Sequence, residues 1–367
     1  MTRIAYLDGI RAIAIGAVLI VHWVASQFAG AYGGYIGVDI FFVLSGFIIT
    51  SLLWRKKPDS SLSPAYFRFL KRRFTRLYPA LLAFVAITLV IYAFFPGAPT
   101  NVKDLILPAV LTLTQGYSFY AGSGAATAAP FAITWSLSVE WIFYLIWPLV
   151  ILSAKRLGVP ARRLMLWVVI VAVGLYGMSL FQDSHWFYYG PLARMPEIML
   201  GGALALSMST TIVCERAKRR EWLLVTGALA ALIFIAGYTI FGPVQWSPVF
   251  RFIGLPATVA AALYLIWFGH AAPASRITAV LSAAPLTFLG RISYSLYLWH
   301  MVGLNLFTTE NMGDLPLPVV GVLGVAAAGV MALLSYRFLE KPFLRARAID
   351  IVSGTTKSDA SATRAVL

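Results

Sequence analysis

The chain has 367 residues, of which 60% are hydrophobic and only 12% are charged. Soluble domains carry about 25% charged residues, so this composition excludes an ordinary soluble domain and indicates a polytopic membrane protein. The net charge of +15 does not indicate a nucleic-acid partner, because the Lys and Arg residues lie in short clusters between apolar runs, as in the inner loops of membrane proteins. The single cysteine, Cys214, excludes an intramolecular disulfide, and no Cys or His spacing is typical of a metal site, so we expect no metal.

Ten apolar runs are long enough to cross a bilayer, which takes about 17 to 25 residues. These runs lie at 10–29, 36–54, 77–95, 134–154, 163–181, 192–210, 222–241, 252–269, 286–308 and 317–339. We therefore predict an all-α, polytopic membrane protein with about ten transmembrane helices in a single transmembrane domain, residues 1–345. Residues 346–367 are expected to form a cytoplasmic tail that is largely disordered, because the tail is mostly small and polar.

An eleventh apolar stretch, residues 104–120, decides the sidedness of the later helices. This stretch is shorter and contains Pro108 and several threonines. If it does not cross, the basic loops 55–76, 155–163 and 214–221 all lie on one side of the membrane. Because cytoplasmic loops carry an excess of Lys and Arg, we predict a short re-entrant or interfacial segment, with both termini cytoplasmic.

The first apolar run contains two ionisable residues, Arg11 and His22. The run lacks a basic leader and a cleavage site, so we expect it to be retained as a helix. Eleven residues rotate an α-helix by about 20° net and rise ~16.5 Å, so both side chains lie on one face. A snorkelling arginine and a structural histidine would explain each residue alone. The shared face favours an elongated ligand that is anionic at its inner end and reactive deeper in the membrane.

Four ionisable residues on four predicted helices lie at a similar depth, about 5 to 12 Å below the outer helix ends. They are His22, Asp39, Glu140 and His300. Two histidines and two carboxylates in one layer predict a buried acid–base site. The structural alternative is a His–carboxylate pair that holds helices together. The ligand types would suit zinc, but no local metal-binding spacing supports it.

The inner segment "YFRFLKRRFTRLYPA" combines five cations with aromatic residues: Arg68, Lys71, Arg72, Arg73 and Arg76. Positive-inside topology alone accounts for most of these side chains. Guanidinium groups also bind phosphate, and aromatic rings stack on bases. Coenzyme A has the matching shape, with a phosphorylated nucleotide head and a long, thin arm that ends in a thioester.

At these residues the sequence resembles the acyltransferase 3 family of integral-membrane O-acyltransferases. The resemblance covers residues 6 to 343 and rests on Arg-x10-His in the first run and on "GVDIFFVLSGFIIT", "RRFTRLYPA", "TWSLSVEWIFYLIWP", "RMPEIMLGGALA", "GRISYSLYLWH" and "YRFLEKP". It implies transfer of an acyl group, usually acetyl, from cytoplasmic acyl-CoA to a carbohydrate or glycoconjugate acceptor at the outer side of the bacterial inner membrane. It also implies that Arg11 and His22 are essential, that the inner arginines matter, and that this is the form without an appended domain.

The residues and the resemblance together predict roles for the site. His22 is the expected general base, with Glu140 or Asp39 orienting it. The residues expected to bind acyl-CoA are Arg11, Arg68, Arg72, Arg73 and Arg76. The candidate acceptor-binding residues are Tyr188, Tyr189, Arg194, Glu197, Tyr294 and His300, of which Arg194 and Glu197 are also spaced as a local ion pair.

The main alternative is a transporter of a lipid-linked saccharide or a small anion. Transporters usually show repeat symmetry, and we find no internal repeat in this sequence. The sequence specifies neither the acceptor, nor the length of the acyl group, nor an oligomeric state.

Overall fold

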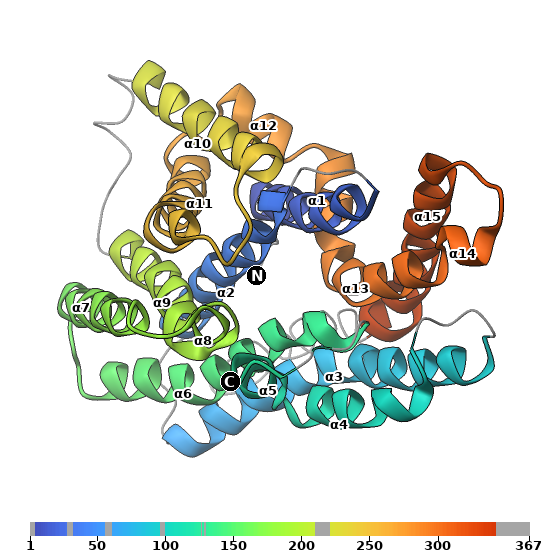
Figure 1. Ribbon diagram of the computed structural model, residues 1–367. Helices are drawn as coiled ribbons and strands as arrows, with labels where there is room; N and C mark the ends of the chain where they lie inside the picture. The colour runs from blue at the N-terminus through green and yellow to red at the C-terminus, as the bar shows by residue number, and fades with distance from the viewer. Residues whose placement is uncertain are drawn as a thin grey trace, which may run out of the picture.

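The computed structural model describes residues 4–27, 32–55, 61–95, 100–125, 127, 130–209 and 221–342. All regular structure in these ranges is helical, which confirms the all-α prediction (Figure 1). The ten long helices are α1 (Ala5–Gln27), α2 (Ile36–Arg55), α3 (Leu62–Phe94), α6 (Trp135–Arg156), α7 (Ala161–Ser179), α9 (Pro191–Met208), α10 (Glu221–Phe241), α11 (Leu255–Ala271), α13 (Ala284–Leu306) and α15 (Leu317–Ser335). The predicted tail, residues 346–367, lies outside the described residues.

Short helices connect the long ones. They are α4 (Ile106–Thr114), α5 (Tyr117–Gly122), α8 (Ser184–Tyr189), α12 (Arg276–Leu281) and α14 (Thr309–Met312), with 3₁₀ turns at Tyr32–Tyr35, Val102–Leu105 and Phe131–Thr134 and π-helical turns at Phe250–Gly254 and Tyr336–Glu340.

Each of the ten predicted apolar runs falls on one of the ten long helices. The prediction of a loop over 55–76 is wrong for residues 62–76, because α3 begins at Leu62. Eight helical stretches in the described residues are long and apolar enough to cross a membrane. Helices α9 and α13 are not among these eight, although they are as long as their neighbours. Their sequences are more polar, and α9 carries Arg194 and Glu197, whose side chains are buried inside the bundle. The chain is therefore a multi-pass membrane protein with two relatively polar helices in its interior.

Helices α1 and α2 occupy the middle of the bundle in Figure 1. Helices α10, α11 and α12 lie on one side of them and α13 and α15 on another, while α3, α4 and α6 and the group α7, α8 and α9 complete the ring. The elements that carry Arg11, His22, Asp39, Glu140 and His300 therefore meet around one centre, although they span almost 300 residues of sequence.

Small residues allow the central helices to approach until their backbones touch. A Cβ atom added at Gly37 on α2 would lie 2.2 Å from the carbonyl oxygen of Ala14 on α1. A Cβ atom at Gly290 on α13 would lie 1.9 Å from the carbonyl oxygen of Asp8 on α1. Main-chain packing through small residues is typical of membrane helices, where it takes the place of hydrophobic burial as the source of association. Helix α1 is thus held by backbone contact from two directions.

The segment 104–120 does not form one crossing helix. Helix α4 has only 9 residues and ends at Gln115, whose φ of 60° is left-handed. Nine helical residues span ~13.5 Å, less than half of a bilayer core of about 30 Å. Ile106 and Leu107 are exposed, as expected for side chains that face lipid at an interface. The prediction of a short, non-crossing segment is confirmed, and the sidedness that follows from it remains a prediction.

We expect a cysteine at Leu157, between α6 and α7, to resist an impermeant thiol reagent in intact cells and to react after lysis, because this loop is predicted to be cytoplasmic. Leu157 is 78% exposed, which makes it a better reporter than its neighbours Ala154, which is 7% exposed, and Gly158, which has a φ of +65°. The measurement is reagent labelling of a variant in which Cys214 is replaced by serine. A cysteine at Phe181, which is 93% exposed beyond the other end of α7, is the matched control and should react without lysis. The reverse pattern would overturn the predicted sidedness.

Candidate functional site

A cavity with about 730 Å³ of empty space lies between α1, α2, α3, α6 and α13. Its polar lining residues are Arg11, Ser45, Arg73, Arg76, Ser136, Glu140, Tyr144, Ser293, Tyr294 and Tyr297. These residues come from five helices that are far apart in sequence, so the cavity exists only in the assembled bundle. Pockets with a few convergent polar groups are typical binding sites.

Three arginines give the cavity its positive charge. Arg11 comes from α1, and Arg73 and Arg76 share one side of α3 because they are three residues apart. The Arg73 guanidinium lies 5.4 Å from the centroid of the Tyr144 ring, within cation–π distance. The Nε atom of Arg76 is buried and has no hydrogen-bond partner among the described residues. A buried donor of this kind is suited to an anionic ligand.

The five cations predicted to lie together do not all line the cavity. They are Arg68, Lys71, Arg72, Arg73 and Arg76. Arg68 and Arg72 are exposed, and neither lines the cavity. The structure therefore brings Arg11, Arg73 and Arg76 together and places Arg68 and Arg72 elsewhere.

Glu140 is held by two hydroxyl groups. Ser45 Oγ donates a hydrogen bond of 2.7 Å to Glu140 Oε1, and the Tyr144 hydroxyl donates one of 2.6 Å to Oε2. These contacts fix the carboxyl group in the wall of the cavity and use both of its oxygens. The expectation that Glu140 orients His22 is therefore not met in this structure.

Asp39 belongs to a separate buried cluster with Arg194 and Glu197. Arg194 Nη1 donates to Asp39 Oδ1 at 2.8 Å and to Glu197 Oε1 at 3.0 Å, and the side chains are 0 to 2% exposed. Arg194 Nε donates to the carbonyl oxygen of Tyr188, and the guanidinium lies 4.7 Å from the centroid of the Tyr188 ring. The predicted Arg194–Glu197 ion pair is confirmed. Asp39 is bound to Arg194 and not to His22, and the assignment of the buried Arg194 and Glu197 as acceptor-binding residues stays a prediction.

His22 and His300 form a pair of rings, with centroids 4.9 Å apart. The Nδ1 atom of His22 lies 2.8 Å from the carbonyl oxygen of Val18, and that of His300 lies 2.7 Å from the carbonyl oxygen of Tyr297. A carbonyl oxygen only accepts hydrogen bonds, so Nδ1 carries the hydrogen in both rings. In a neutral ring the Nε2 atom then keeps its lone pair and can accept a proton. The two histidines are therefore prepared as proton acceptors by their own helices.

His300 and His22 differ in access. His300 is fully buried, and its Nε2 atom has no hydrogen-bond partner among the described residues, whereas His22 is half-buried. His22 is therefore the more accessible member of the pair, and the assignment of His300 as an acceptor-binding residue stays a prediction.

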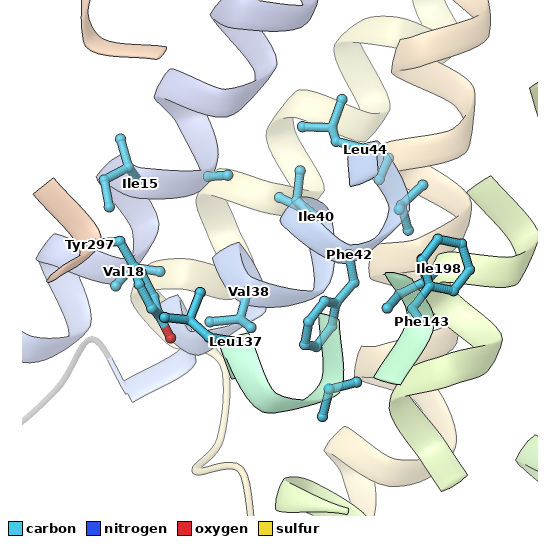
Figure 2. Close-up of a cluster of buried hydrophobic side chains, with 14 of the residues drawn as sticks. Ile15, Val18, Val38, Ile40, Phe42, Leu44, Leu137, Phe143, Ile198 and Tyr297 are labelled. Atoms are coloured by element: carbon cyan, nitrogen blue, oxygen red, sulfur yellow. The ribbon is translucent and has the colours of Figure 1, made fainter. Parts of the chain in front are cut away.

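Tyr297 connects the cavity to the histidine pair. Its ring lines the cavity, lies 5.7 Å from the His300 ring and packs in the core with Val18, Val38 and Leu137 (Figure 2). The Tyr297 hydroxyl donates to the carbonyl oxygen of Ile133 at 2.8 Å. Tyr297 therefore lies between the cavity and the histidine pair and contacts both.

Tyr294, a candidate acceptor residue, lies elsewhere in this region. It lines the cavity with the arginines, and its hydroxyl donates to the carbonyl oxygen of Leu77 at 3.0 Å. Tyr294 is thus on the charged side of the site.

Three further site residues were not predicted from the sequence: Ser45, Tyr144 and Tyr297. Tyr144 follows Glu140 by four residues and Tyr297 precedes His300 by three, so helical periodicity could have placed both beside their partners. Ser45 carries no such signal, because its contact with Glu140 spans 95 residues.

Tyr188 and Tyr189 lie in an aromatic cluster near the Arg194 cluster. Tyr188 is buried against the Trp135 ring, at 5.1 Å between centroids. Tyr189 is half-buried and lies 5.4 Å from the Trp135 ring and 5.8 Å from the exposed Trp246 ring. Of the two tyrosines, Tyr189 is therefore the one that a ligand from outside could reach. Trp246 was not anticipated, because it lies in the connection after α10, far from Tyr189 in sequence.

Within the described ranges, no group of three or more His, Cys, Asp or Glu side chains is arranged to hold a metal ion. The polar chemistry of the region is that of arginines, histidines, tyrosines and one carboxylate: anion binding at one end and proton acceptance at the other.

This combination, in an all-helical membrane bundle, defines a candidate membrane transferase site. Residues 4–336 match the acyltransferase domain family, and the chain belongs to that family. The resemblance to acyltransferase 3 proteins is thereby confirmed.

Two relatives illustrate the similarity. The peptidoglycan O-acetyltransferase OatA of Listeria monocytogenes is 31% identical over 371 residues, covering 95% of this chain and 57% of the relative. The O-acetyltransferase OatA of Staphylococcus aureus is 30% identical over 363 residues, covering 92% of this chain and 56% of the relative. The chain thus spans little more than half the length of these relatives. No solved structure matches it.

Proposed function

We propose that this chain is a membrane O-acyltransferase that moves an acetyl group from acyl-CoA to a hydroxyl of a carbohydrate or glycoconjugate at the outer side of the bacterial inner membrane. The observation that carries the proposal is that Tyr297 lies between a cavity lined by three arginines and the His22–His300 pair. The names of the relatives support acetyl as the transferred group and a glycan such as peptidoglycan as the acceptor.

The donor end of the site is the cavity. Arg11, Arg73 and Arg76 bind the phosphates of acyl-CoA, because planar guanidinium groups suit phosphate oxygens. Eleven residues of helix separate Arg11 from His22, a rise of ~16.5 Å, which the pantetheine arm spans to bring the thioester to the histidines. Arg68 and Arg72, which are exposed, instead add to the excess of positive charge on the cytoplasmic side of the membrane.

The chemical step uses His22 as general base. Its Nε2 atom takes the proton of the acceptor hydroxyl while the hydroxyl oxygen attacks the thioester carbonyl carbon. The new C–O bond forms, the C–S bond breaks, and the coenzyme leaves as a thiolate that finally receives the proton. The half-buried Tyr189 and the exposed Trp246 offer ring faces to the sugar at the acceptor end.

The proposal is tested with the full chain, purified in detergent and supplied with radiolabelled acetyl-CoA and a soluble glycan fragment. We expect radiolabel on the glycan and release of free coenzyme A. If the protein binds neither acetyl-CoA nor its analogues and transfers no label to any glycan offered, the proposal is wrong and the transporter alternative takes its place.

Replacing both Arg73 and Arg76 with alanine should raise the KM for acetyl-CoA at least tenfold. Each lost charge-assisted contact costs about 1.5–3 kcal/mol. Transfer should recover at high acetyl-CoA concentration, because these residues bind the donor without joining the chemical step. The measurement is initial rate against acetyl-CoA concentration.

The matched control is Arg68→Ala with Arg72→Ala. It removes the same charge from the same helix at two exposed positions that do not line the cavity, and its KM should stay close to that of the unchanged protein. If neither double variant raises the KM, all four arginines have a purely topological role, and if both raise it equally, Arg68 and Arg72 bind the donor as well.

A further inference from the structure

The second histidine of the pair has no role in the chemistry described so far. His300 is fully buried, and its Nδ1 atom is used by the carbonyl oxygen of Tyr297. Its Nε2 atom is buried without a hydrogen-bond partner among the described residues. A buried polar atom that lacks a partner is costly, and such atoms are uncommon in native proteins. The cost is explained if the partner is present only during the reaction.

The ring beside His300 is that of His22, at 4.9 Å between centroids and an interplanar angle of 64°. When both rings are neutral, each Nε2 atom is an acceptor, and two acceptors cannot bond to one another. Once one ring gains a proton, its Nε2–H becomes a donor and the other Nε2 can accept it. A hydrogen bond between the two Nε2 atoms therefore requires that one ring be protonated.

The carboxylates do not serve His22 in this way. Glu140 uses both oxygens on Ser45 and Tyr144, and Asp39 is bound to Arg194. Charged His22 therefore has an imidazole beside it where a carboxylate was expected.

We propose that His300 is the proton-sharing partner of His22, an inference that rests on the proposed function. The proton leaves the acceptor hydroxyl and arrives at His22 Nε2 as the C–O bond forms. That N–H then donates to His300 Nε2, and the pair holds one proton and one positive charge until the coenzyme A thiolate takes the proton. His300 is a positioning residue, because its side chain is wholly buried and acts through His22.

Two substitutions separate this role from a structural one. His300→Asn puts an amide nitrogen near the place of Nδ1, which keeps the bond to Tyr297, and removes Nε2. His300→Gln puts an amide near the place of Nε2, where its oxygen can accept a hydrogen bond. We expect His300→Asn to lower kcat by about 10- to 100-fold with little change in the KM for acetyl-CoA, the usual effect of losing a charge-assisted hydrogen bond. His300→Gln should recover a substantial part of this loss.

A double variant tests whether His300 acts through His22. If it does, His22→Ala with His300→Asn is no slower than His22→Ala alone, because the partner has nothing left to stabilise. The control is His270→Asn, which removes an exposed histidine at the end of α11 and should keep the kcat of the unchanged protein.

Three results would overturn the inference: His300→Asn at the unchanged rate, equal losses in the Asn and Gln variants, or additive losses in the double variant. These outcomes differ from failure of the proposed function. If His22→Ala lowers transfer and His300→Asn does not, only the pairing is wrong. If His22→Ala itself transfers acetyl normally, the proposed function of His22 is wrong, and this inference is wrong with it.

Discussion

The variant His22→Ala is expected to lose acetyl transfer by about 10²- to 10⁴-fold while it still binds acyl-CoA, because this is the usual contribution of a positioned general base. His22 does not line the arginine cavity, so its loss leaves the donor site in place. The measurements are kcat with a soluble glycan acceptor and the Kd of a non-hydrolysable acyl-CoA analogue. We expect a large fall in kcat and a nearly constant Kd.

His270→Ala is the control for this prediction, since it removes a histidine that is exposed at the end of α11. Comparable thermal stability of the two variants shows that each has folded. A folded His22→Ala protein that transfers acetyl at the unchanged rate would remove His22 from the mechanism. A protein that loses donor binding as well would show that His22 holds the thioester in place of, or in addition to, accepting the proton.

The variant Arg194→Ala is expected to have the largest effect on stability, about 3–5 kcal/mol. Breaking a buried ion pair leaves uncompensated charge, in this case the two carboxylates of Asp39 and Glu197. The guanidinium also packs against the Tyr188 and Trp135 rings, and that packing is lost. A lower Tm and a lower yield of monodisperse protein in detergent are the expected readouts.

A variant that removes all the charges together is the informative control. Asp39→Asn, Glu197→Gln and Arg194→Met leave no buried charge without a partner, and replacement of a whole buried ionic cluster is often nearly neutral. This triple variant should be more stable than Arg194→Ala alone. The same Tm for Arg194→Ala and the unchanged protein would mean that the cluster contributes nothing to the fold.

The presence of the ten long helices was predictable from sequence, because a membrane-spanning run must be apolar over about 20 residues. The start of α3 at Leu62 was not, because its first turns are basic rather than apolar. The failure of 104–120 to cross was also predictable, from its length and from the clustering of basic loops on one side. Both features depend on local sequence and on the bilayer, and neither depends on how the helices pack.

The sequence predicted the depth of the four ionisable residues but not which of them contact one another. Depth follows from position along a helix, so the sequence placed His22, His300, Asp39 and Glu140 at one level. The direction of each side chain around its helix depends on tertiary packing, which depth does not specify. The structure therefore divides the layer into a histidine pair, a cavity carboxylate and a buried cluster around Arg194.

For the arginines of α3 as well, the sequence gives their order around the helix but not the direction in which they face. Steps of about 100° per residue place Arg68, Arg72, Arg76 and Arg73 in that order along one arc of the helix. Periodicity gives this order, and only the contact of α3 with α6 and α13 determines where the arc turns into the cavity. Two of the four face outward as a result.

The backbone contacts of α1 have a consequence for the selection of the donor. Gly37 and Gly290 bring the main chains of α2 and α13 against the carbonyl oxygens of Ala14 and Asp8, so α1 is closely packed on two sides. Arg11 and His22 are therefore held at a fixed separation along this helix. Under the proposed function, the arm between the phosphates of the donor and its thioester must match that separation. A thioester on a shorter arm, such as an acetylated cysteamine, would stop short of His22 even at saturating concentration, however reactive its carbonyl carbon.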